Sequence, residues 1–300
     1  MRRDIIFASK GLHCRGWIYV PDGLAQGQKA PAIILAQGFA GEKEAILPDH
    51  AEQFVRAGFV ALVFDYRYFG DSEGEPRHQL FPLEQVEDVR NAITWISDQP
   101  EVDSQRIGLW GISFGGGIVI YTATYDRRVK AVVAQVPLAI SLEVRSKLDP
   151  ERWKRMSDFL LQDRIKRYKT GAVNYLKVVS LEEDPCVFPG KEFYDEYMDL
   201  LARHPKSNPT WRNGVSLESL EKVREFDPVG MIHYMAPTAL LLIAAENDSA
   251  IPVDAVRETY KRAGEPKALS VLPIKHFEIN AEPWLTKSAA EAINWYNKYL

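Results

Sequence analysis

Residues 107–117 read IGLWGISFGGG, and this stretch decides the fold. It begins as a short apolar run of strand length and continues from Phe114 as a segment of helical character. Ser113 therefore falls at a strand-to-helix corner. Gly111 and Gly115 are small enough for such a tight turn to pack, with the hydroxyl held at the helix N-terminus. The context favours a nucleophilic serine over the alternative, a serine that only caps the helix.

Around this corner, apolar runs of strand length alternate with longer segments of helical periodicity. The expected strands are 32–36, 60–64, 107–110, 129–136, 239–244 and 268–272, and the expected helices are 48–57, 83–98, 114–125, 253–263 and 283–299. Gly58 and Gly264 mark the ends of two of these helices, Gly58 as a left-handed cap. Segments 4–8 and 14–20 predict an antiparallel hairpin at the sheet edge. The pattern predicts an α/β fold, a mostly parallel sheet with helices on both faces.

The alternation breaks after Pro137. Residues 138–230 contain helical stretches but no convincing buried strand, so we interpret them as a helical cap inserted after the strand at 129–136. The core then comprises residues 1–137 and 231–300. Several short helices are expected in the cap, because prolines divide it at positions 185, 189, 205 and 209. Its aromatic residues are Trp153, Phe159, Tyr168, Tyr175, Phe193, Tyr194, Tyr197 and Trp211.

Two further side chains complete the chemistry that Ser113 would need. A serine hydroxyl is a poor nucleophile near neutral pH, so it requires a base, and the base requires a carboxylate that fixes its tautomer. Asp248 follows the expected strand 239–244, and His276 follows the last expected strand. Because the carboxyl ends of neighbouring parallel strands meet at one edge, both loops would reach the serine. The sequence predicts Ser113, Asp248 and His276 as catalytic residues.

Other residues compete for these roles. Only His276 follows a core strand; the remaining histidines are His13, His50, His78, His204 and His233. Glu246 is the rival of Asp248, because both lie in one loop. Asp65 is a further candidate for the acid, but its neighbourhood through Ser72 favours a hydrogen-bonded structural turn.

Acyl transfer also requires donors for the oxyanion of the tetrahedral intermediate, and backbone N–H groups supply them without reorganisation. The N–H of Phe114 follows the nucleophile directly. A second donor is expected in the loop Gln37 to Gly41, after the strand at 32–36, at the N–H of Phe39. The alternative is that this loop is a plain turn that ends the strand.

Composition limits the partners. The 300 residues carry 37 Lys and Arg against 41 Asp and Glu, a net charge of -4, so we expect no nucleic acid partner. The N-terminal segment lacks an apolar signal region, and no segment has about 18 consecutive apolar residues, so a cytoplasmic protein without a membrane partner is predicted. Whether it acts as a monomer or a homodimer stays open.

The sequence predicts no cofactor and no bound metal. There is no HExxH motif, and Gly111 to Gly117 lacks the pattern of a dinucleotide site. The cysteines, Cys14 and Cys186, have neither CxxC spacing nor histidine neighbours, so we expect free thiols.

These motifs together resemble those of the α/β-hydrolase superfamily. The resemblance covers the chain outside the insertion and is carried by Gln37-Gly38-Phe39, Phe64 to Gly74, Gly111 to Gly115, the Asp248 loop and His276-Phe277. Within it, Phe64 to Gly74 and Trp211 to Pro228 are similar to the branch of Xaa-Pro dipeptidyl-peptidase-like hydrolases and polyketide transferases. Gln37 is a departure, because many members have a histidine where it stands, at a position that supports the oxyanion loop.

The resemblance implies a serine hydrolase that forms an acyl-enzyme from an ester, thioester or related substrate. The cap would fold over Ser113, and an apolar acyl part would enter between them. Three alternatives remain. The enzyme would pass a polyketide or fatty acyl group to an alcohol or amine, or would use the same residues for carbon–carbon chemistry, or the chain would be a non-catalytic binding protein with this fold.

One stretch of the insertion is strongly basic. From Arg152 to Lys169 there are seven basic residues and two acidic residues, Asp158 and Asp163. The basic residues are Arg152, Lys154, Arg155, Arg164, Lys166, Arg167 and Lys169. One interpretation is a solvated face of a cap helix. The other is a docking surface for an acidic donor, an acyl carrier protein or the phosphates of coenzyme A, as the resemblance to polyketide transferases implies.

Overall fold

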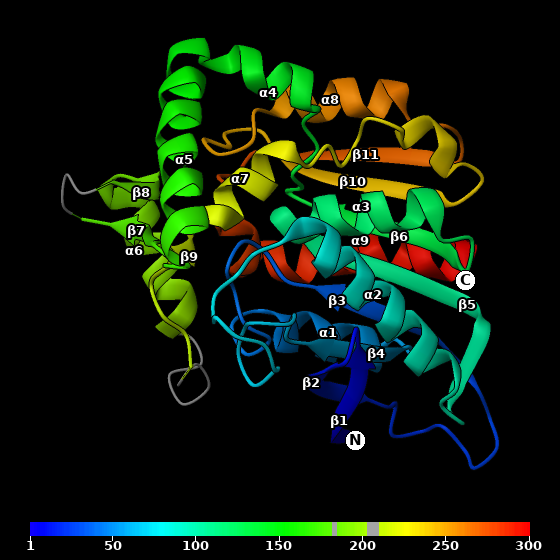
Figure 1. Cartoon of the computed structure of the whole chain (residues 1–300). Coiled ribbons are helices and arrows are strands. Elements are labelled where there is room, and N and C mark those ends of the chain that lie inside the picture. The colour runs from blue at the N-terminus through cyan, green and yellow to red at the C-terminus, as the bar shows by residue number, and fades with distance from the viewer. Residues whose placement is uncertain (182–184, 203–209) are drawn as a thin grey trace.

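The computed structural model describes residues 1–181, 185–202 and 210–300. Its described part contains an eight-stranded sheet with the strand order β1-β2-β4-β3-β5-β6-β10-β11. The strands are β1 Arg2–Ser9, β2 Leu12–Tyr19, β3 Ala30–Ala36, β4 Val60–Phe64, β5 Val102–Ile112, β6 Val129–Gln135, β10 Ala239–Ala245 and β11 Lys267–Leu272. Strand β2 is antiparallel to β1 and to β4, and the other neighbours are parallel. The carboxyl ends of β5, β10 and β11 therefore lie at the same edge of the sheet (Figure 1).

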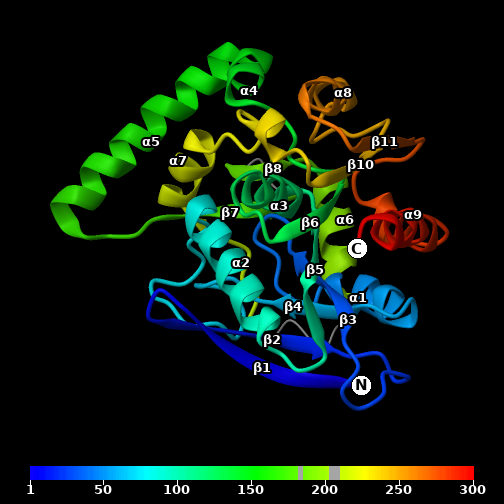
Figure 2. The same ribbon diagram turned by 90° about the vertical axis from the view of Figure 1, so that its right-hand side faces the viewer.

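Helices cover both faces of this sheet (Figure 2). One face packs against α2 Pro82–Ser97, α3 Phe114–Tyr125 and α8 Val253–Arg262, and the other against α1 Leu47–Arg56 and α9 Trp284–Tyr299. The central strands are buried on both faces, as in β4, where all five residues are buried. Such continuous apolar runs are typical of a parallel sheet between helical layers.

The predicted core elements are confirmed with small shifts of their ends. The largest difference is β5, which begins at Val102 rather than at Ile107, because Val102 pairs with Ala30 of β3 ahead of a register shift, after which Ile107 pairs with Ala32. Gly58 has φ of +94°, the left-handed conformation expected at the end of α1. Gly264 lacks that conformation; there the absent side chain lets the chain pack closely, since a Cβ would lie 2.8 Å from the Cβ of Ala236.

The segment between β6 and β10 is not purely helical, which corrects the sequence prediction. It contains α4 Leu142–Leu148, α5 Pro150–Thr170, β7 Tyr175–Ser180, β8 Cys186–Pro189, α6 Lys191–Ala202, β9 Val215–Ser216 and α7 Leu217–Glu225. The strands form a three-stranded sheet in the order β8-β7-β9. Helix α5 is long, at 21 residues, because the four prolines that were expected to divide the cap all follow it, and Pro150 stands at its start, where a helix tolerates proline. Residues His204, Pro205 and Pro209 lie outside the described residues, and the domain boundaries stay a prediction.

Two further observations concern the chain as a whole. Among the described helices, none combines the length and the apolar character that crossing a lipid bilayer requires. Cys14 is buried in β2, Cys186 begins β8, and neither forms a disulfide in the described chain.

The stability of this core is expected to depend on pH through His50. Its imidazole is buried in α1 against the ring of Trp110, with 4.3 Å between the centroids. Burial lowers the pKa of His50 from 6.5 to about 4. A base with a lowered folded pKa contributes stability that is present above its unfolded pKa and lost as the pH falls through this window. Between about pH 7 and pH 5 the wild-type protein should lose about 2 kcal/mol more stability than His50→Asn, measured by urea unfolding. Equal losses would mean that His50 does not titrate in this way.

Candidate active site

Ser113 lies at a strained corner between β5 and α3. It has φ of 54° and ψ of -119°, a conformation that residues with a side chain rarely adopt. Its N–H donates to the carbonyl oxygen of Gln135 at 2.9 Å, and its carbonyl oxygen accepts from the N–H of Leu138 at 2.7 Å. The neighbouring end of β6 therefore holds the corner from both sides of the serine.

The glycines on either side of Ser113 are required by close approach of the backbone. A Cβ on Gly111 would lie 2.3 Å from the carbonyl oxygen of Gly115, and a Cβ on Gly115 would lie 2.3 Å from that of Ala36. Neither position has space for a side chain, so the sharp turn and the packing of α3 on β3 depend on both glycines.

The structure brings Ser113, Asp248 and His276 together. Nε2 of His276 lies 3.0 Å from Oγ of Ser113, and Nδ1 lies 2.7 Å from Oδ2 of Asp248. The other carboxylate oxygen, Oδ1, accepts the N–H groups of Ala250 and Ile251, each at 2.8 Å. The side chains of His276 and Asp248 are 6% and 2% exposed. This arrangement holds the imidazole between an acceptor carboxylate and the serine hydroxyl, with little access for water.

The competing residues lie elsewhere. Glu246 is exposed at the end of β10, and Asp65 is buried, where it accepts from the N–H and the Nζ of Lys43. His13 pairs with Glu73 at the sheet edge. The ring of His78 packs on Phe69, His50 is buried in the core, and His233 is exposed. Asp65 is thus part of a structural turn, as expected, and His204 is outside the described residues.

Phe39 and Phe114, whose N–H groups are the two expected oxyanion donors, both line the pocket together with Ser113. Neither donates to an acceptor within the described chain. The rings of Phe39 and Phe114 pack edge to face, with centroids 5.7 Å apart. Gln37 supports the loop from inside, since its Nε2 donates to the carbonyl oxygen of Glu42 and its Oε1 accepts from the N–H of Gly38, both at 2.8 Å. The amide of Gln37 thus bridges the loop from Gly38 to Glu42.

A buried ammonium group fixes the far end of this loop. Nζ of Lys43 donates to Glu44 at 2.6 Å and to Asp65 and Asp71 at 2.7 Å each, and the lysine side chain is 2% exposed. The three carboxylates lie close enough together to resemble a cation site, but the ammonium of Lys43 already contacts all three. The cluster therefore ties the loop to β4 and the turn that follows it.

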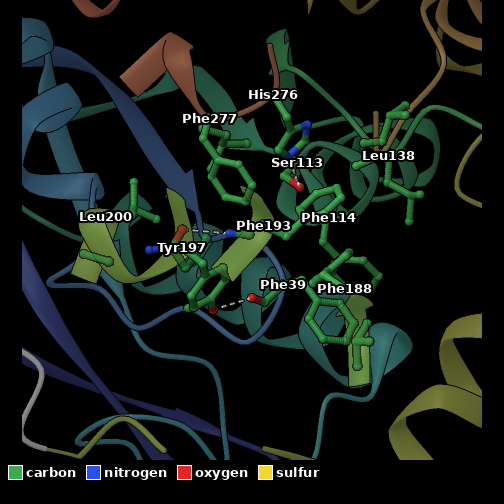
Figure 3. Close-up of a pocket in the computed structure, with 18 of the residues that line it drawn as sticks. Phe39, Ser113, Phe114, Leu138, Phe188, Phe193, Tyr197, Leu200, His276 and Phe277 are labelled. Atoms are coloured by element: carbon green, nitrogen blue, oxygen red, sulfur yellow. Dashed lines mark hydrogen bonds between the residues drawn. The ribbon is translucent and has the colours of Figure 1, made fainter. Parts of the chain in front are cut away.

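A cavity of about 230 Å³ opens beside Ser113 and His276. Figure 3 shows the serine hydroxyl facing the imidazole, with aromatic side chains from core and cap gathered around them. The cap contributes much of the wall, through Arg145, Val187, Phe188, Phe193, Tyr197, Leu200, Leu201, Leu220 and Val223. Most of these side chains are apolar, so the cavity suits a mostly apolar ligand.

Two residues of the insertion, Tyr197 and Trp211, also hold the loop of the expected donor Phe39 by hydrogen bonds, a role that was not predicted from the sequence. The hydroxyl of Tyr197 donates to the carbonyl oxygen of Phe39 at 3.0 Å, and Nε1 of Trp211 donates to that of Ala40 at 3.2 Å. Ala40 has φ of 53°, so these bonds flank a strained residue. The sequence marks both residues only as cap aromatics, because a contact across 158 residues leaves no local signal.

The sheet order, the corner at Ser113 and the loops at the carboxyl ends of β10 and β11 define an α/β hydrolase. The α/β hydrolase GrgF from Penicillium sp. sh18, a crystal structure, matches this fold with a TM-score of 0.84 at 29% identity, covering 100% of this chain and 99% of that one. The profile of the X-Pro dipeptidyl-peptidase (S15) family matches residues 12–278. The chain belongs to this family.

Two curated relatives resemble it over most of their length. The polyketide transferase grgF of a Penicillium species is 32% identical over 272 residues, which cover 90% of this chain and 87% of that protein. The thiohydrolase aneE of Aspergillus aculeatus is 29% identical, over 86% of this chain and 80% of that protein. The protein is accordingly an enzyme of the hydrolase or acyltransferase class.

Proposed function

We propose that the protein is a serine hydrolase that cleaves an ester or thioester with an apolar acyl part through an acyl-enzyme on Ser113. The observation that carries this proposal is the position of His276, 3.0 Å from Oγ of Ser113 and 2.7 Å from Oδ2 of Asp248. The apolar cavity beside these groups supports an acyl chain as the bound part. We also propose that the protein is cytoplasmic, as predicted from the sequence.

The proposed reaction has two halves. Oγ of Ser113 attacks the carbonyl carbon while its proton moves to Nε2 of His276, and the N–H groups of Phe39 and Phe114 stabilise the oxyanion. His276 then protonates the leaving thiol or alcohol, which departs as the acyl-enzyme forms. In the second half a water molecule attacks the acyl carbon while His276 takes a proton from that water. His276 then returns this proton to Oγ of Ser113 as the bond between Oγ and the acyl carbon breaks, and the acid is released. Asp248 keeps the imidazole in the tautomer that accepts the serine proton.

A fluorophosphonate tests the acyl-enzyme directly. The reagent should label Ser113 in the wild-type protein, with the adduct located by peptide mass spectrometry, and should fail to label Ser113→Ala. The matched control is Ser249→Ala, an exposed serine in the loop of Asp248, which should label as the wild type does. Labelling elsewhere, or none at all, would contradict the mechanism. Ester and thioester series of rising chain length then define the acyl preference.

Transfer to an alcohol or amine is the second candidate function. The relative grgF is named a polyketide transferase, and the aneE relative is named a thiohydrolase, so relatives of both kinds resemble this chain. Both reactions share the first half and differ in the nucleophile that enters the second. Measuring product partition between water and added alcohols or amines at a fixed thioester concentration distinguishes them.

A proline at position 39 tests the oxyanion loop. Phe39→Pro deletes the proposed donor N–H and should lower kcat by ~10² or more, because one oxyanion donor stabilises mainly the transition state. Phe39→Ala keeps the N–H and should change mainly KM, since the ring packs at the pocket wall. A folded Phe39→Pro protein with near wild-type kcat would require another donor. Circular dichroism and thermal unfolding check the fold of both variants.

The basic stretch of the cap would serve as the docking surface for an acidic acyl donor. Arg164 and Arg167 are engaged with Glu221 of α7, so reversing them would disturb the packing of α5 itself. Lys154 and Lys169 are exposed and make no ion pair with the described residues. The helix also exposes apolar side chains, namely Phe159, Leu161, Ile165 and Tyr168. A surface that is both basic and apolar is suited to an acyl carrier protein or a coenzyme A thioester.

Reversing the charge of Lys154 and Lys169 tests this docking surface. The double variant to Glu should raise KM for carrier-bound or coenzyme A thioesters roughly 10-fold at low salt and leave small neutral esters unchanged, because only the charged donors are attracted. Lys287→Glu with Lys298→Glu, on α9 of the core, gives the same change of net charge as a control. Equal effects on charged and neutral substrates, or no effect on either, would leave only a solvated helix face.

A further inference from the structure

Among the described residues that line the cavity, Arg145 of α4 is the one with a permanent charge. The other polar lining groups outside the candidate triad are bound to the protein. Gln37 bridges the oxyanion loop, the hydroxyl of Tyr197 donates to a carbonyl of that loop, and Asn280 donates to a backbone carbonyl. A polar part of a substrate would therefore gain the most binding free energy from a contact with Arg145.

The guanidinium of Arg145 uses one of its three nitrogens on the protein. Nη2 donates to the carbonyl oxygen of Phe226 at 2.6 Å and lies 3.4 Å from that of Arg224, at the C-terminal end of α7. Nε is shielded from solvent and has no acceptor, and Nη1 has none in the described chain either. The anchored nitrogen fixes the guanidinium plane. Nε is too shielded for a ligand to reach it, so the donors that remain available for a ligand are those on Nη1.

The positive charge of Arg145 also lacks a direct counter-ion. Asp227 acts on it through space, but its two carboxylate oxygens accept the N–H groups of Leu142 and Val229, each at 3.2 Å. Burial lowers the pKa of Arg145, so its surroundings disfavour the charged form, although a guanidinium keeps its proton at neutral pH. A partly buried cation with unfilled donors destabilises the protein unless an acceptor binds there.

We propose that Arg145 binds an oxygen atom on the acyl chain of the substrate, from a carboxylate or a ketone remote from the scissile carbonyl. The planar guanidinium presents donors suited to such oxygens, and a charged donor forms the stronger hydrogen bonds. The cavity then accepts an oxygenated acyl chain, with its apolar carbons against the cap aromatics. This inference rests on the proposed function, since it concerns the same cavity.

Binding to an inactive protein tests the inference without turnover. Ser113→Ala is titrated by calorimetry with methyl octanoate, monomethyl suberate and methyl 7-oxooctanoate, which share the ester and differ at the far end of the chain. The two oxygenated esters, or the suberate ester alone if only an anion binds, should bind ~10-fold or more tightly than methyl octanoate. Adding Arg145→Met should abolish that difference and leave methyl octanoate unchanged.

Turnover with the matching thioesters provides the second readout. In the otherwise wild-type protein, Arg145→Met should lower kcat/KM ~10-fold or more for the oxygenated acyl groups, mainly through KM, and leave the octanoyl thioester within about two-fold. Arg224→Met is the matched control, because this guanidinium packs on the ring of Trp153 at 3.6 Å and does not line the cavity. It should keep the wild-type preference.

The outcomes separate this inference from the proposed function. Equal binding of the three esters by Ser113→Ala, or equal loss for all three on adding Arg145→Met, would overturn the inference and leave Arg145 as a cap of α7. If Arg145→Met fails to fold, Arg145→Lys keeps the charge and should retain part of the preference for suberate; its complete loss in a folded protein would also count against the inference. Failure of the fluorophosphonate to label Ser113 would contradict the acyl-enzyme and leave the binding result standing.

Discussion

Replacing Ser113 or His276 by alanine is expected to lower kcat by ~10³ or more in each case, with KM changed much less. The physical reason is the 3.0 Å contact between Nε2 of His276 and Oγ of Ser113. Without the imidazole the hydroxyl keeps its proton and stays a poor nucleophile, and without the hydroxyl the imidazole has nothing to activate. Steady-state kinetics on a p-nitrophenyl ester measures both losses.

The double variant gives the sharper result. Because the two groups act as one unit, Ser113→Ala combined with His276→Ala should be hardly slower than either single variant. Multiplicative losses would mean that the serine and the histidine act independently. His233→Ala is the matched control, since it removes an exposed histidine outside the pocket and should leave kcat unchanged.

The corner at Ser113 was predictable because the sequence signals that mark it are local. Within residues 107–117 an apolar strand leads into a helix, with one glycine on each side of Ser113. The structure has the strand and the helix in these places. Asp248 and His276 are distant in sequence, yet their relation was also predictable, since parallel neighbouring strands such as β10 and β11 bring their following loops to one edge. The parallel order of the core strands therefore allowed the three side chains to be predicted as neighbours in space.

The cap was harder to predict because its contacts are not local. The two-residue strand β9 pairs with β7 across about 40 residues and has no periodicity of its own. β7 does alternate between exposed and buried positions at its start, and this short alternation was the one local signal of a strand there. Arg145 lies in the short helix α4, and no feature of the neighbouring sequence distinguishes it from the exposed basic residues of α5. Its position in the cavity arises from carbonyls of Arg224 and Phe226, some 80 residues further along the chain.

Asp248→Asn should lower kcat by ~10³ or more while the protein stays folded, because the amide changes the tautomer of His276. Oδ1 of Asp248 is held by the N–H groups of Ala250 and Ile251, so the amide oxygen of an asparagine would occupy that position. Its NH₂ group would then face Nδ1 of His276, where Oδ2 lies at 2.7 Å in the wild type. An NH₂ group donates, so Nδ1 must accept, and the imidazole proton moves to Nε2. In that tautomer Nε2 cannot take the proton of Ser113.

Glu246→Gln is the control that makes this prediction specific. It makes the same carboxylate-to-amide change two residues away in the same loop, but at an exposed side chain, so kcat should stay within about two-fold of the wild type. Both variants are compared by kcat on one ester and by thermal unfolding, because the buried asparagine must be shown to leave the fold intact. A strong loss in Glu246→Gln with near-normal turnover in Asp248→Asn would transfer the acid role to Glu246. A strong loss in both would mean that the loop, rather than one carboxylate, orients the imidazole.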